Sequence, residues 1–409
     1  MPSDGGKLPF DYYFCSSFCS SVQYSIPDFC SQVFCAFRRG EQRKSYFGDE
    51  KYNLQEIGKS TGFPRKPYAV FRSDCKGAQK EFAVNQKIWI GVDGGGTHST
   101  AVAVRPDGQV VAVTKGEGLN YHQDGLETVR FRLAGLITRL CEQAAARADA
   151  VCAALAALDG PASRETLSYF ASGLGPAVQL DLQSDAYAAL LGLTLGDPGM
   201  IVICGTGSML LLMDGNGSLH TAGGWGYLLG DAGSGYTLAR EAILAVAAES
   251  DCTGPATAFT PLALSFFGAT SPRQLIDRIY APSCTPDRLA SFARYVLKEA
   301  ESGEPSAMDI LYRNMDRLAD LGERLIRKAP EVRLAGLYGG IFAHSGLARR
   351  LFQDALTSRV PDVCFREPAF PPELGAVIHL MRLRGPLNAD VLARMKQTYD
   401  TIRPDGAAD

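Results

Sequence analysis

The stretch that decides the fold is Ile88–Gly118, which reads IWIGVDGGGTHSTAVAVRPDGQVVAVTKGEG. It predicts three short strands, over 88–92, 100–104 and 110–114, because these runs are apolar and rich in β-branched residues. Asp107-Gly108, between the second and third runs, is typical of a two-residue hairpin turn. The turn between the first and second runs holds more glycine than a hairpin needs, which indicates a functional segment.

This first turn is Asp93-Gly94-Gly95-Gly96-Thr97. Three successive glycines leave the backbone without side chains, so its N–H groups can approach an anion closely. Asp93, at the end of the strand, is placed to hold Mg²⁺ through water, and Thr97 to donate its hydroxyl to a phosphate. The turn therefore indicates a phosphate site, and a glycine-rich turn without a ligand is the alternative.

The composition is that of an α/β protein with more than one domain. The chain has 409 residues, 46% of them hydrophobic, and length alone predicts two or three domains. A net charge of −3 gives no global attraction to nucleic acid or to an anionic membrane. There is no run of about 18 apolar residues that would predict a transmembrane helix. After residue 86 the cysteines lie singly in apolar segments, as reduced thiols of a cytoplasmic protein do.

Residues 1–86 differ from the rest of the chain. Tyr, Phe, Ser and Cys dominate 8–37, a basic run follows at 38–44, and neither helical nor strand periodicity persists. We expect a poorly ordered extension. The alternative is upstream sequence translated from a misplaced start codon, and the interrupted apolar pattern disfavours a secretory signal. The pairs Cys15/Cys19 and Cys30/Cys35 lack a nearby histidine to complete a zinc site.

An α/β layer follows the opening strands. A helix is predicted over 124–148, a strand over 151–158, a helix over 164–172, a strand over 177–182 and a helix over 186–191. The resulting order, β-β-β-α-β-α-β-α, is that of an α/β layer with an antiparallel start.

The opening pattern then returns, about 110 residues further along. Strands are predicted over 199–204, 209–213 and 219–222, and the first of them ends in the small-residue turn Gly205-Thr206-Gly207-Ser208. Two similar halves, each with a phosphate-contacting turn, are therefore predicted. The alternative is a coincidence between two common hairpins.

Two further glycine-rich segments stand in the second half. Segment 223–235 surrounds Trp225 with glycines, which is typical of a cleft wall rather than a core. After a mostly helical region over 261–328, a strand over 333–338 leads into Gly339-Gly340 and a helix over 345–357. A glycine pair at such a junction is where a nucleotide's adenosine or phosphate commonly lies. A strand over 362–365 and helices over 371–384 and 389–399 complete the chain.

In order and spacing, these motifs resemble the two phosphate turns and the adenosine motif of the actin-like/sugar-kinase/Hsp70 ATPase superfamily. Gly118-Leu-Asn120, Ser184-Asp-Ala186 and the long Gly223-Gly-Trp-Gly…Gly-Asp-x-Gly-Ser234 segment resemble the BadF/BadG-type ATPase family, and within it the N-acetylglucosamine kinase branch. The resemblance covers about residues 87–385. It implies an α/β fold with two ribonuclease-H-like (actin-like ATPase) lobes, over 87–198 and 199–386, with a cleft between them, and a C-terminal helix and tail over 387–409.

The resemblance also implies an activity. It implies a cytoplasmic kinase that uses ATP and Mg²⁺ to phosphorylate the 6-hydroxyl of an amino sugar, with N-acetylglucosamine as the leading candidate. Met209 stands where mammalian-type enzymes carry an Asn that contacts the sugar, so glucosamine and N-acetylmuramic acid remain open. Small-molecule partners are implied, without nucleic acid or membrane, and a homodimer is left open. Two other classes are weighed: an ATP-driven iron–sulfur activator of an acyl-CoA dehydratase or reductase, and a non-catalytic sugar- or nucleotide-binding regulator.

Carried over residue by residue, the resemblance makes Asp185 the base that takes the proton of the sugar hydroxyl. Its alternative role is the N-cap of the next helix, and Asp159 is a weaker candidate for the base. Asp231, which otherwise caps its own following helix, and Asn120 resemble sugar ligands, with Gly224 and Trp225 lining the same pocket. The nucleotide contacts implied are Gly94, Gly95, Gly96, Thr97, Gly205, Thr206, Gly207, Ser208, Gly339 and Gly340, and the metal residue is Asp93.

Overall fold

The computed structural model describes residues 44–47, 50–53, 87–156, 158, 162–175 and 177–402. The chain divides into two compact units, Met1–Lys80 and Glu81–Asp409. In the first unit, β1 (Lys44–Phe47) and β2 (Glu50–Asn53) pair as antiparallel strands, where the sequence had predicted no strand. The two cysteine pairs, the rest of the expected extension and Asp159 lie outside the described residues.

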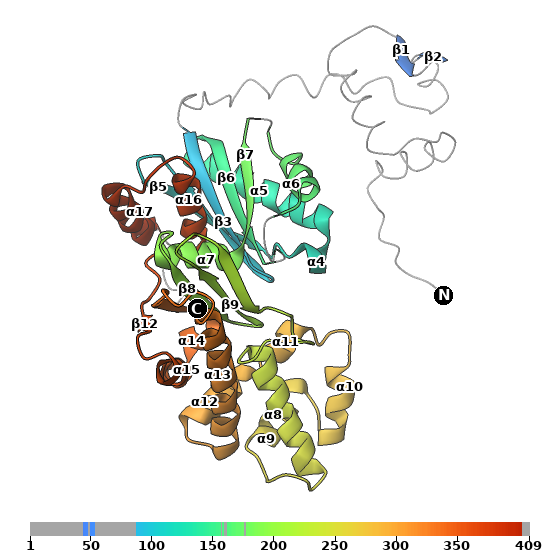
Figure 1. The fold of residues 1–409 in the computed structure, drawn as a ribbon. Helices are drawn as coiled ribbons and strands as arrows, with labels where there is room; N and C mark the ends of the chain where they lie inside the picture. The colour runs from blue at the N-terminus through green and yellow to red at the C-terminus, as the bar shows by residue number, and fades with distance from the viewer. Residues whose placement is uncertain are drawn as a thin grey trace. The chain divides into compact units, whose positions relative to one another are not determined.

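The first lobe of the second unit is built on a five-stranded sheet (Figure 1). The strands lie in the order β5-β4-β3-β6-β7, in which the first three are antiparallel neighbours while β6 and β7 run parallel to β3. The predicted order of elements is confirmed, apart from the additional short helix α4. The elements are β3 (Lys87–Gly94), β4 (His98–Val104), β5 (Val110–Glu117), α4 (Tyr121–Asp124), α5 (Leu126–Ala144), β6 (Arg147–Leu155), α6 (Arg164–Ala171), β7 (Gln179–Ser184) and α7 (Asp185–Thr194).

The helix predicted over 124–148 is shorter than expected. It ends at Ala144 because Ala145 adopts a left-handed backbone with φ 47°, and the Ala145 N–H donates to carbonyl oxygens of the last helical turn. Residues 147–150 instead begin β6, and Arg147 pairs with Lys87 of β3. The alanine-rich run there suits a helix or a buried strand equally well, and pairing with β3 decides for the strand.

The second lobe repeats the topology of the first. Its sheet has the order β10-β9-β8-β11-β12, with β8, β9 and β10 antiparallel and β11 and β12 parallel to β8. The first strand of each lobe therefore forms a hairpin with the second and lies parallel to the fourth. The two similar halves predicted from the sequence are confirmed. The strands are β8 (Gly199–Cys204), β9 (Ser208–Met213), β10 (Leu219–Gly223), β11 (Leu334–Tyr338) and β12 (Cys364–Phe365).

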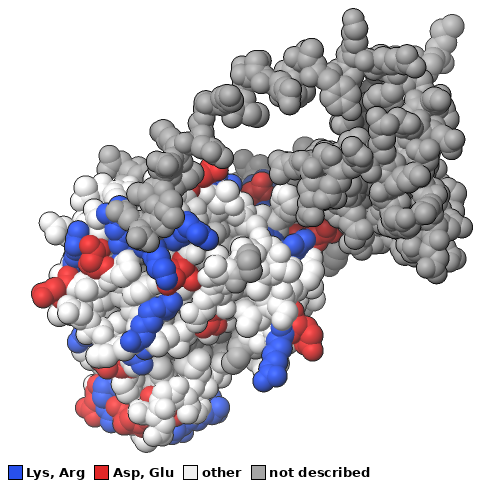
Figure 2. All heavy atoms as spheres, turned by 90° about the horizontal axis from the view of Figure 1, so that it is seen from above, with Lys and Arg blue, Asp and Glu red and all other residues white. Residues whose placement is uncertain are grey.

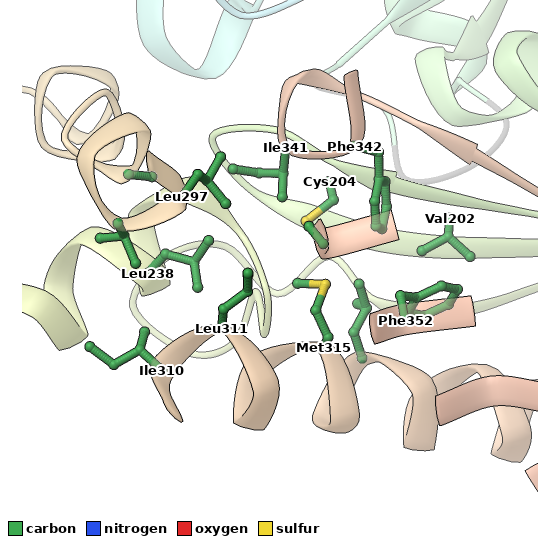
Figure 3. Close-up of a cluster of buried hydrophobic side chains, with 14 of the residues drawn as sticks. Val202, Cys204, Leu238, Leu297, Ile310, Leu311, Met315, Ile341, Phe342 and Phe352 are labelled. Carbon is green, nitrogen blue, oxygen red and sulfur yellow. The ribbon is translucent and has the colours of Figure 1, made fainter. Parts of the chain in front are cut away.

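Helices cover the second sheet and enclose a large apolar core. The longest, α13, contributes Ile310, Leu311 and Met315 to the same buried cluster as Val202 and Cys204 of β8 (Figure 3). Burial of the apolar side chains in this core is the main contribution to the stability of the lobe. The helices of this lobe are α8 (Gly235–Ser250), α9 (Phe259–Phe267), α10 (Leu275–Ile279), α11 (Pro286–Ala290), α12 (Ala293–Glu301), α13 (Pro305–Ile326), α14 (Gly340–His344) and α15 (Gly346–Arg359), with a 3₁₀ turn at Pro272–Gln274.

Two helices join the lobes. Helix α7 carries the chain from the first sheet to the second, and its alanines and leucines pack against Ile201 and Leu211 of the second sheet (Figure 1). Helix α16 (Pro372–Arg382) brings the chain back and packs on α7 and β3. The two backbones nearly touch, because an ideal Cβ on Gly375 would lie 1.9 Å from the carbonyl oxygen of Ala188. The last helix, α17 (Ala389–Ile402), packs on β5.

Charges of both signs are interspersed on the face drawn in Figure 2, where no large area of one sign is seen among the described residues. In the part of the chain that the structure describes, no helix is both long and apolar enough to cross a membrane.

Candidate functional site

The glycine turn of the first lobe joins β3 to β4. Asp93 lies one residue before the end of β3, between Thr100 of β4 and Ala154 of β6. Among the described residues, the backbone N–H groups of 95–97 have no hydrogen-bond partner. The Thr97 hydroxyl is hydrogen-bonded to the ring Nδ1 of His98 at 3.0 Å. A run of unpaired N–H groups in a turn is the arrangement that binds a phosphate.

The segment after β5 lies directly on this turn. An ideal Cβ on Gly118 would stand 2.0 Å from the carbonyl oxygen of Gly96, so no larger residue fits without a shift of the backbone. Asn120 follows, and its side-chain oxygen caps α4 by accepting from the N–H of His122 at 3.0 Å. The side-chain nitrogen of Asn120 has no partner within the described residues, so this nitrogen is the atom available to a ligand.

The corresponding turn of the second lobe joins β8 to β9. The Thr206 hydroxyl donates to Asp287 Oδ1 at 2.9 Å, and the Ser208 hydroxyl donates to the carbonyl oxygen of Ala232 at 2.7 Å. Both hydroxyl protons are therefore held within the protein. The backbone N–H groups of Thr206 and Gly207, by contrast, have no partner in the described part of the chain. Both lobes thus present unpaired N–H groups from turns at equivalent positions.

Asp231 ties the Gly-Gly-Trp-Gly loop to this second turn. Its side chain is buried, its backbone is left-handed with φ 65°, and an ideal Cβ on Gly207 would stand 2.8 Å from its Oδ2. Burial raises the pKa of Asp231, while hydrogen bonds from the N–H groups of Ser208 and Gly226 act in the opposite direction. The Asp231 carboxylate therefore contacts both the 205–208 turn and the loop that contains Gly226.

The glycine pair of the second half also lies at this turn. Tyr338, the last residue of β11, pairs with Ile203 of β8, so the two strands end side by side. Gly339 has φ 103°, and an ideal Cβ on it would stand 2.5 Å from the carbonyl oxygen of Cys204. Only glycine suits this conformation and this contact. Gly340 then begins α14. Residues 205–208, Asp231 and the glycine pair therefore form one group on the second lobe.

Asp93 and Asp185 form a second group, on the first lobe. Leu155 of β6 pairs with Gly94 on one side and with Ser184 on the other, so the carboxyl ends of β3, β6 and β7 meet at one edge of the sheet. Burial, and then the negative charges of Glu373 and Asp185, raise the pKa of Asp93 well above its ordinary value. This edge is therefore crowded with carboxylates, which is energetically costly unless a cation is present.

Neither Asp185 nor Asp231 is the N-cap of the helix that follows it. The cap of α7 is Ser184, whose hydroxyl accepts from the N–H of Tyr187 at 3.1 Å, and Asp185 is the first helical residue. The cap of α8 is Ser234. Serine is as good an N-cap as aspartate. Ser184 and Ser234 each stand directly before the first residue of their helix, whereas Asp185 is already helical and Asp231 lies three residues before Ser234. The alternative capping roles considered for Asp185 and Asp231 are therefore wrong.

The loop around Trp225 is exposed. Trp225 is 73% exposed and Leu229 is 81% exposed, although both are large and apolar. Gly223, Gly224 and Gly226 all have positive φ, so the loop depends on glycine for its course. An exposed apolar loop of this kind is typical of a surface that contacts a ligand or a partner. The exposure excludes a core segment, and the cleft wall stays a prediction.

The donor groups at the first turn suit Mg²⁺, which needs few protein ligands, better than a metal ion that protein side chains alone coordinate. No group of three or more His, Cys, Asp or Glu side chains in the described part of the chain is arranged to hold a metal ion. Mg²⁺ commonly takes one or two carboxylates and completes its shell with water and substrate phosphates. Asp93, whose pKa is raised by burial and then by the charges of Glu373 and Asp185, offers such a carboxylate beside unpaired N–H groups. The residues present therefore fit a Mg²⁺–phosphate complex.

Two cavities lie away from both groups. One of about 630 Å³ is lined by β5 and α5 residues that include Phe131 and Arg132, and one of about 430 Å³ is lined by Tyr187, His379 and Arg382. No candidate site residue lines either cavity. The candidate site therefore rests on the backbone N–H groups and carboxylates described above.

Two residues of the site were not predicted from the sequence. Glu373 stands in a buried helix, and a charged residue among apolar ones was a visible signal. The sequence around Asp287 carried no such signal, because the contact between Asp287 and Thr206 joins segments that are far apart in the chain.

The comparisons with known proteins agree with this geometry. Residues 90–379 match the model of the BadF/BadG/BcrA/BcrD ATPase family. The N-acetyl-D-glucosamine kinase of Dictyostelium discoideum is 27% identical over 72% of this chain and 98% of its own length. The glucosamine kinase GspK of Vibrio cholerae is 30% identical over 54% of this chain and 75% of its own length.

A solved structure shares the fold. The crystal structure of a putative N-acetylglucosamine kinase from Chromobacterium violaceum superposes with a TM-score of 0.61 at 27% identity, covering 72% of this chain and 98% of the other. The two-lobed actin-like fold and the family resemblance predicted from the motifs are thereby confirmed. The chain belongs to the BadF/BadG/BcrA/BcrD ATPase family.

Proposed function

We propose that this chain transfers the γ-phosphoryl group of ATP to the 6-hydroxyl of an amino sugar. The observation that carries the proposal is the pair of equivalent turns with unpaired backbone N–H groups, one in each lobe, the first of which lies at the sheet edge that bears Asp93 and Asp185. Phosphoryl transfer needs positioning and charge neutralisation more than covalent chemistry, and this arrangement offers both. The similarity to amino-sugar kinases supports the choice of acceptor and does not favour the iron–sulfur activator.

The nucleotide is proposed to lie along the second lobe and to reach the first with its phosphates. Gly339, pressed against Cys204, leaves a bare backbone for the adenosine, and residues 205–208 offer N–H groups to a phosphate. Residues 94–97 contact the phosphates from the opposite lobe. Asp93 is the residue that would hold Mg²⁺, which supplies positive charge to the phosphates when bound.

Asp185 is proposed as the base. Its carboxylate takes the proton from the sugar 6-hydroxyl as that oxygen attacks the γ-phosphorus, and the bond from the γ-phosphorus to the bridging oxygen breaks to release ADP. The start of α7 suits an ionised carboxylate, because the N-terminus of a helix favours negative charge. The base is also fixed in place, because α7 is buried between the two sheets.

The sugar is proposed to lie between the Asp185 edge and the exposed loop. Asn120 offers its side-chain nitrogen, Asp231 a carboxylate oxygen, and Gly224 and Trp225 a surface that covers the ring. Met209 packs under Gly224, since its Cβ would stand 3.4 Å from an ideal Cβ on that glycine. We propose N-acetylglucosamine as the first substrate to test, ahead of glucosamine and N-acetylmuramic acid.

We place the enzyme in the cytoplasm, where ATP is available, and propose a homodimer as the assembly to test.

The test is a coupled assay of ADP release over N-acetylglucosamine, glucosamine, N-acetylmuramic acid and glucose, with and without Mg²⁺. Sugar-dependent ADP release is expected with at least one amino sugar, and ³¹P–¹H NMR of the product is expected to show the phosphate on O6. ADP release that no sugar accelerates would overturn the proposal, and a phosphate on another hydroxyl would overturn the assignment of O6.

A further inference from the structure

The C-terminal helix α17 is docked on the hairpin that opens the first lobe, although it lies beyond the residues matched by the family model. Met395 and Tyr399 are buried in a cluster with apolar residues of β4, β5 and α16. The Thr398 hydroxyl accepts from the N–H of Val110 at 2.9 Å, and Arg394 pairs with Asp107 at 2.8 Å. A helix with this much buried contact is part of the lobe and not a loose tail.

One contact of this helix reaches the acidic edge. The Tyr399 hydroxyl donates to Glu373 Oε1, and both side chains are about 95% buried, with 5% and 4% exposure. Glu373 is the second residue of α16, and its carbonyl oxygen would stand 2.0 Å from an ideal Cβ on Gly91. The start of α16 is therefore pressed against β3 two residues before Asp93.

A buried carboxylate at this position needs an explanation. An apolar residue would stabilise the contact between α16 and β3, whereas a buried charge costs free energy that its hydrogen bonds repay only in part. Glu373 also adds negative charge beside Asp93, the carboxylate proposed to hold the metal. A costly charge next to a functional group points to a role in arranging that group.

We propose that Tyr399 is a positioning residue, which holds Glu373 against the end of β3 so that the docked C-terminal helix sets the place of Asp93. This inference rests on the proposed function of Asp93. It assigns a task to a segment outside the family match, and it makes the C-terminal helix a component of the metal–phosphate end of the site.

The first variant is Tyr399→Phe, which keeps the packed ring and removes one hydrogen-bond donor to Glu373. We expect the Mg²⁺ concentration for half-maximal activity and the KM for ATP to rise about tenfold, with a change of less than twofold in the KM for sugar. The matched control is Thr398→Val, which removes the hydrogen bond from the same helix to Val110 and does not touch Glu373. Both variants are expected to lower the melting temperature by similar amounts, and Thr398→Val is expected to leave the Mg²⁺ requirement unchanged.

A second readout does not depend on turnover. Mg²⁺ with ADP is expected to raise the melting temperature of the wild-type protein and of Thr398→Val equally, because a ligand that binds the native state stabilises it. The rise is expected to be smaller in Tyr399→Phe. If Mg²⁺ with ADP raised the melting temperature of all three proteins equally, the proposal would be overturned. It would also be overturned if this rise were reduced equally in Tyr399→Phe and Thr398→Val.

The double variant Tyr399→Phe/Glu373→Gln separates positioning from folding. Because it removes the charge together with its donor, it is expected to recover part of the stability lost in Tyr399→Phe, a non-additive result. It serves as the test protein where Tyr399→Phe does not fold, and a Mg²⁺·ADP response equal to that of the wild type would then overturn the proposal.

The positioning role can also be separated from the kinase function. A wild-type protein that releases no ADP with any sugar but gains stability from Mg²⁺·ADP, in a way that Tyr399→Phe reduces, would refute the sugar-kinase function and support the positioning role. No stabilisation of the wild type by Mg²⁺·ADP would overturn both.

Discussion

The hydroxyl of Thr206 donates a 2.9 Å hydrogen bond to the carboxylate of Asp287, a residue 81 positions further along the chain. Thr206 belongs to the turn between β8 and β9 that is proposed to bind phosphate, and Asp287 to the short helix α11. This contact ties the turn to the helical layer that covers the second sheet. It also engages the Thr206 hydroxyl within the protein, so the groups that the turn leaves unpaired are backbone N–H groups.

Asp287→Ala is expected to raise the KM for ATP about fivefold, with little change in the KM for sugar. A hydrogen bond to a charged group contributes about 1.5–3 kcal/mol, part of which is lost as mobility of the turn. Steady-state kinetics with each substrate varied in turn measures the effect. Thr206→Ser keeps the hydroxyl and should behave like the wild type, and equal changes in both KM values would argue against a local effect on the turn.

Asp185→Asn is expected to lower kcat by about 10³-fold, within the range attributed to general-base catalysis. Asparagine has nearly the same shape, and the cap of α7 is Ser184, so the fold should be unchanged. Binding of ADP, measured by calorimetry, should stay within about twofold of the wild type. A variant that keeps more than a tenth of the wild-type kcat would remove Asp185 from the base role.

Sugar binding is expected to change the fluorescence of Trp225. The chain has two tryptophans, and Trp225 is 73% exposed whereas Trp89 lies in β3 under the guanidinium of Arg384. If the loop covers the sugar, emission should shift to shorter wavelength as Trp225 leaves water. Trp225→Phe should abolish the shift and Trp89→Phe should keep it. Survival of the shift in Trp225→Phe would show that the loop does not cover the sugar.

Asp231→Asn is expected to change how stability depends on pH. Burial raises the pKa of Asp231 above its ordinary value of 3.8, so the folded protein holds this proton more tightly than the unfolded chain. That contribution is fully present below the unfolded pKa and is lost as pH rises through the folded pKa. Above about pH 4 the wild type should therefore lose stability relative to Asp231→Asn, by about 2 °C in melting temperature.

Melting curves of both proteins from acid to neutral pH give this difference directly. Asparagine tolerates the left-handed backbone at this position, so the substitution adds no strain. The same variant should bind sugar more weakly if Asp231 is a sugar ligand. A difference in melting temperature that is constant with pH would mean that Asp231 does not titrate with a raised pKa.

Gly375→Ala is expected to destabilise the protein by about 3 kcal/mol, the upper part of the range for overpacked sites. The added methyl would stand 1.9 Å from the backbone oxygen of Ala188, and neither helix can move without disturbing a sheet. Gly175→Ala is the control, because an ideal Cβ there meets nothing within 4 Å. Denaturant unfolding should show a change within about 0.5 kcal/mol for the control. A similar small change for Gly375→Ala would show that α7 and α16 can separate.

Local patterns were enough to predict most of the fold. The three opening strands, the repeat near Gly205 and the glycine pair at Gly339 were all found at their predicted places, because each depends on the periodicity or backbone freedom of neighbouring residues. The end of α5 was not predicted. An alanine-rich run has no strong preference, and there pairing with β3 decided the structure.

The positions of the two turns were predictable, because glycine, threonine and serine at strand ends depend only on local backbone freedom. Their contact with phosphate stays a prediction. The capping roles offered for Asp185 and Asp231 failed because Ser184 and Ser234 compete for the same N–H groups, and local sequence alone does not decide that competition. Glu373, Asp287 and Tyr399 lie far along the chain from the groups they contact, and only the folded structure brings them there.

The matching turns of the two lobes differ at one position that has a chemical consequence. Asp93 precedes the glycines of the first turn, and the residue that precedes Gly205 in the second is Cys204. That thiol is fully buried and donates to the carbonyl oxygen of Gly233, and burial raises its pKa, so it carries no charge. The first turn therefore begins with an ionisable side chain and the second with a neutral one, so a negative charge at these two strand ends can come only from the first lobe.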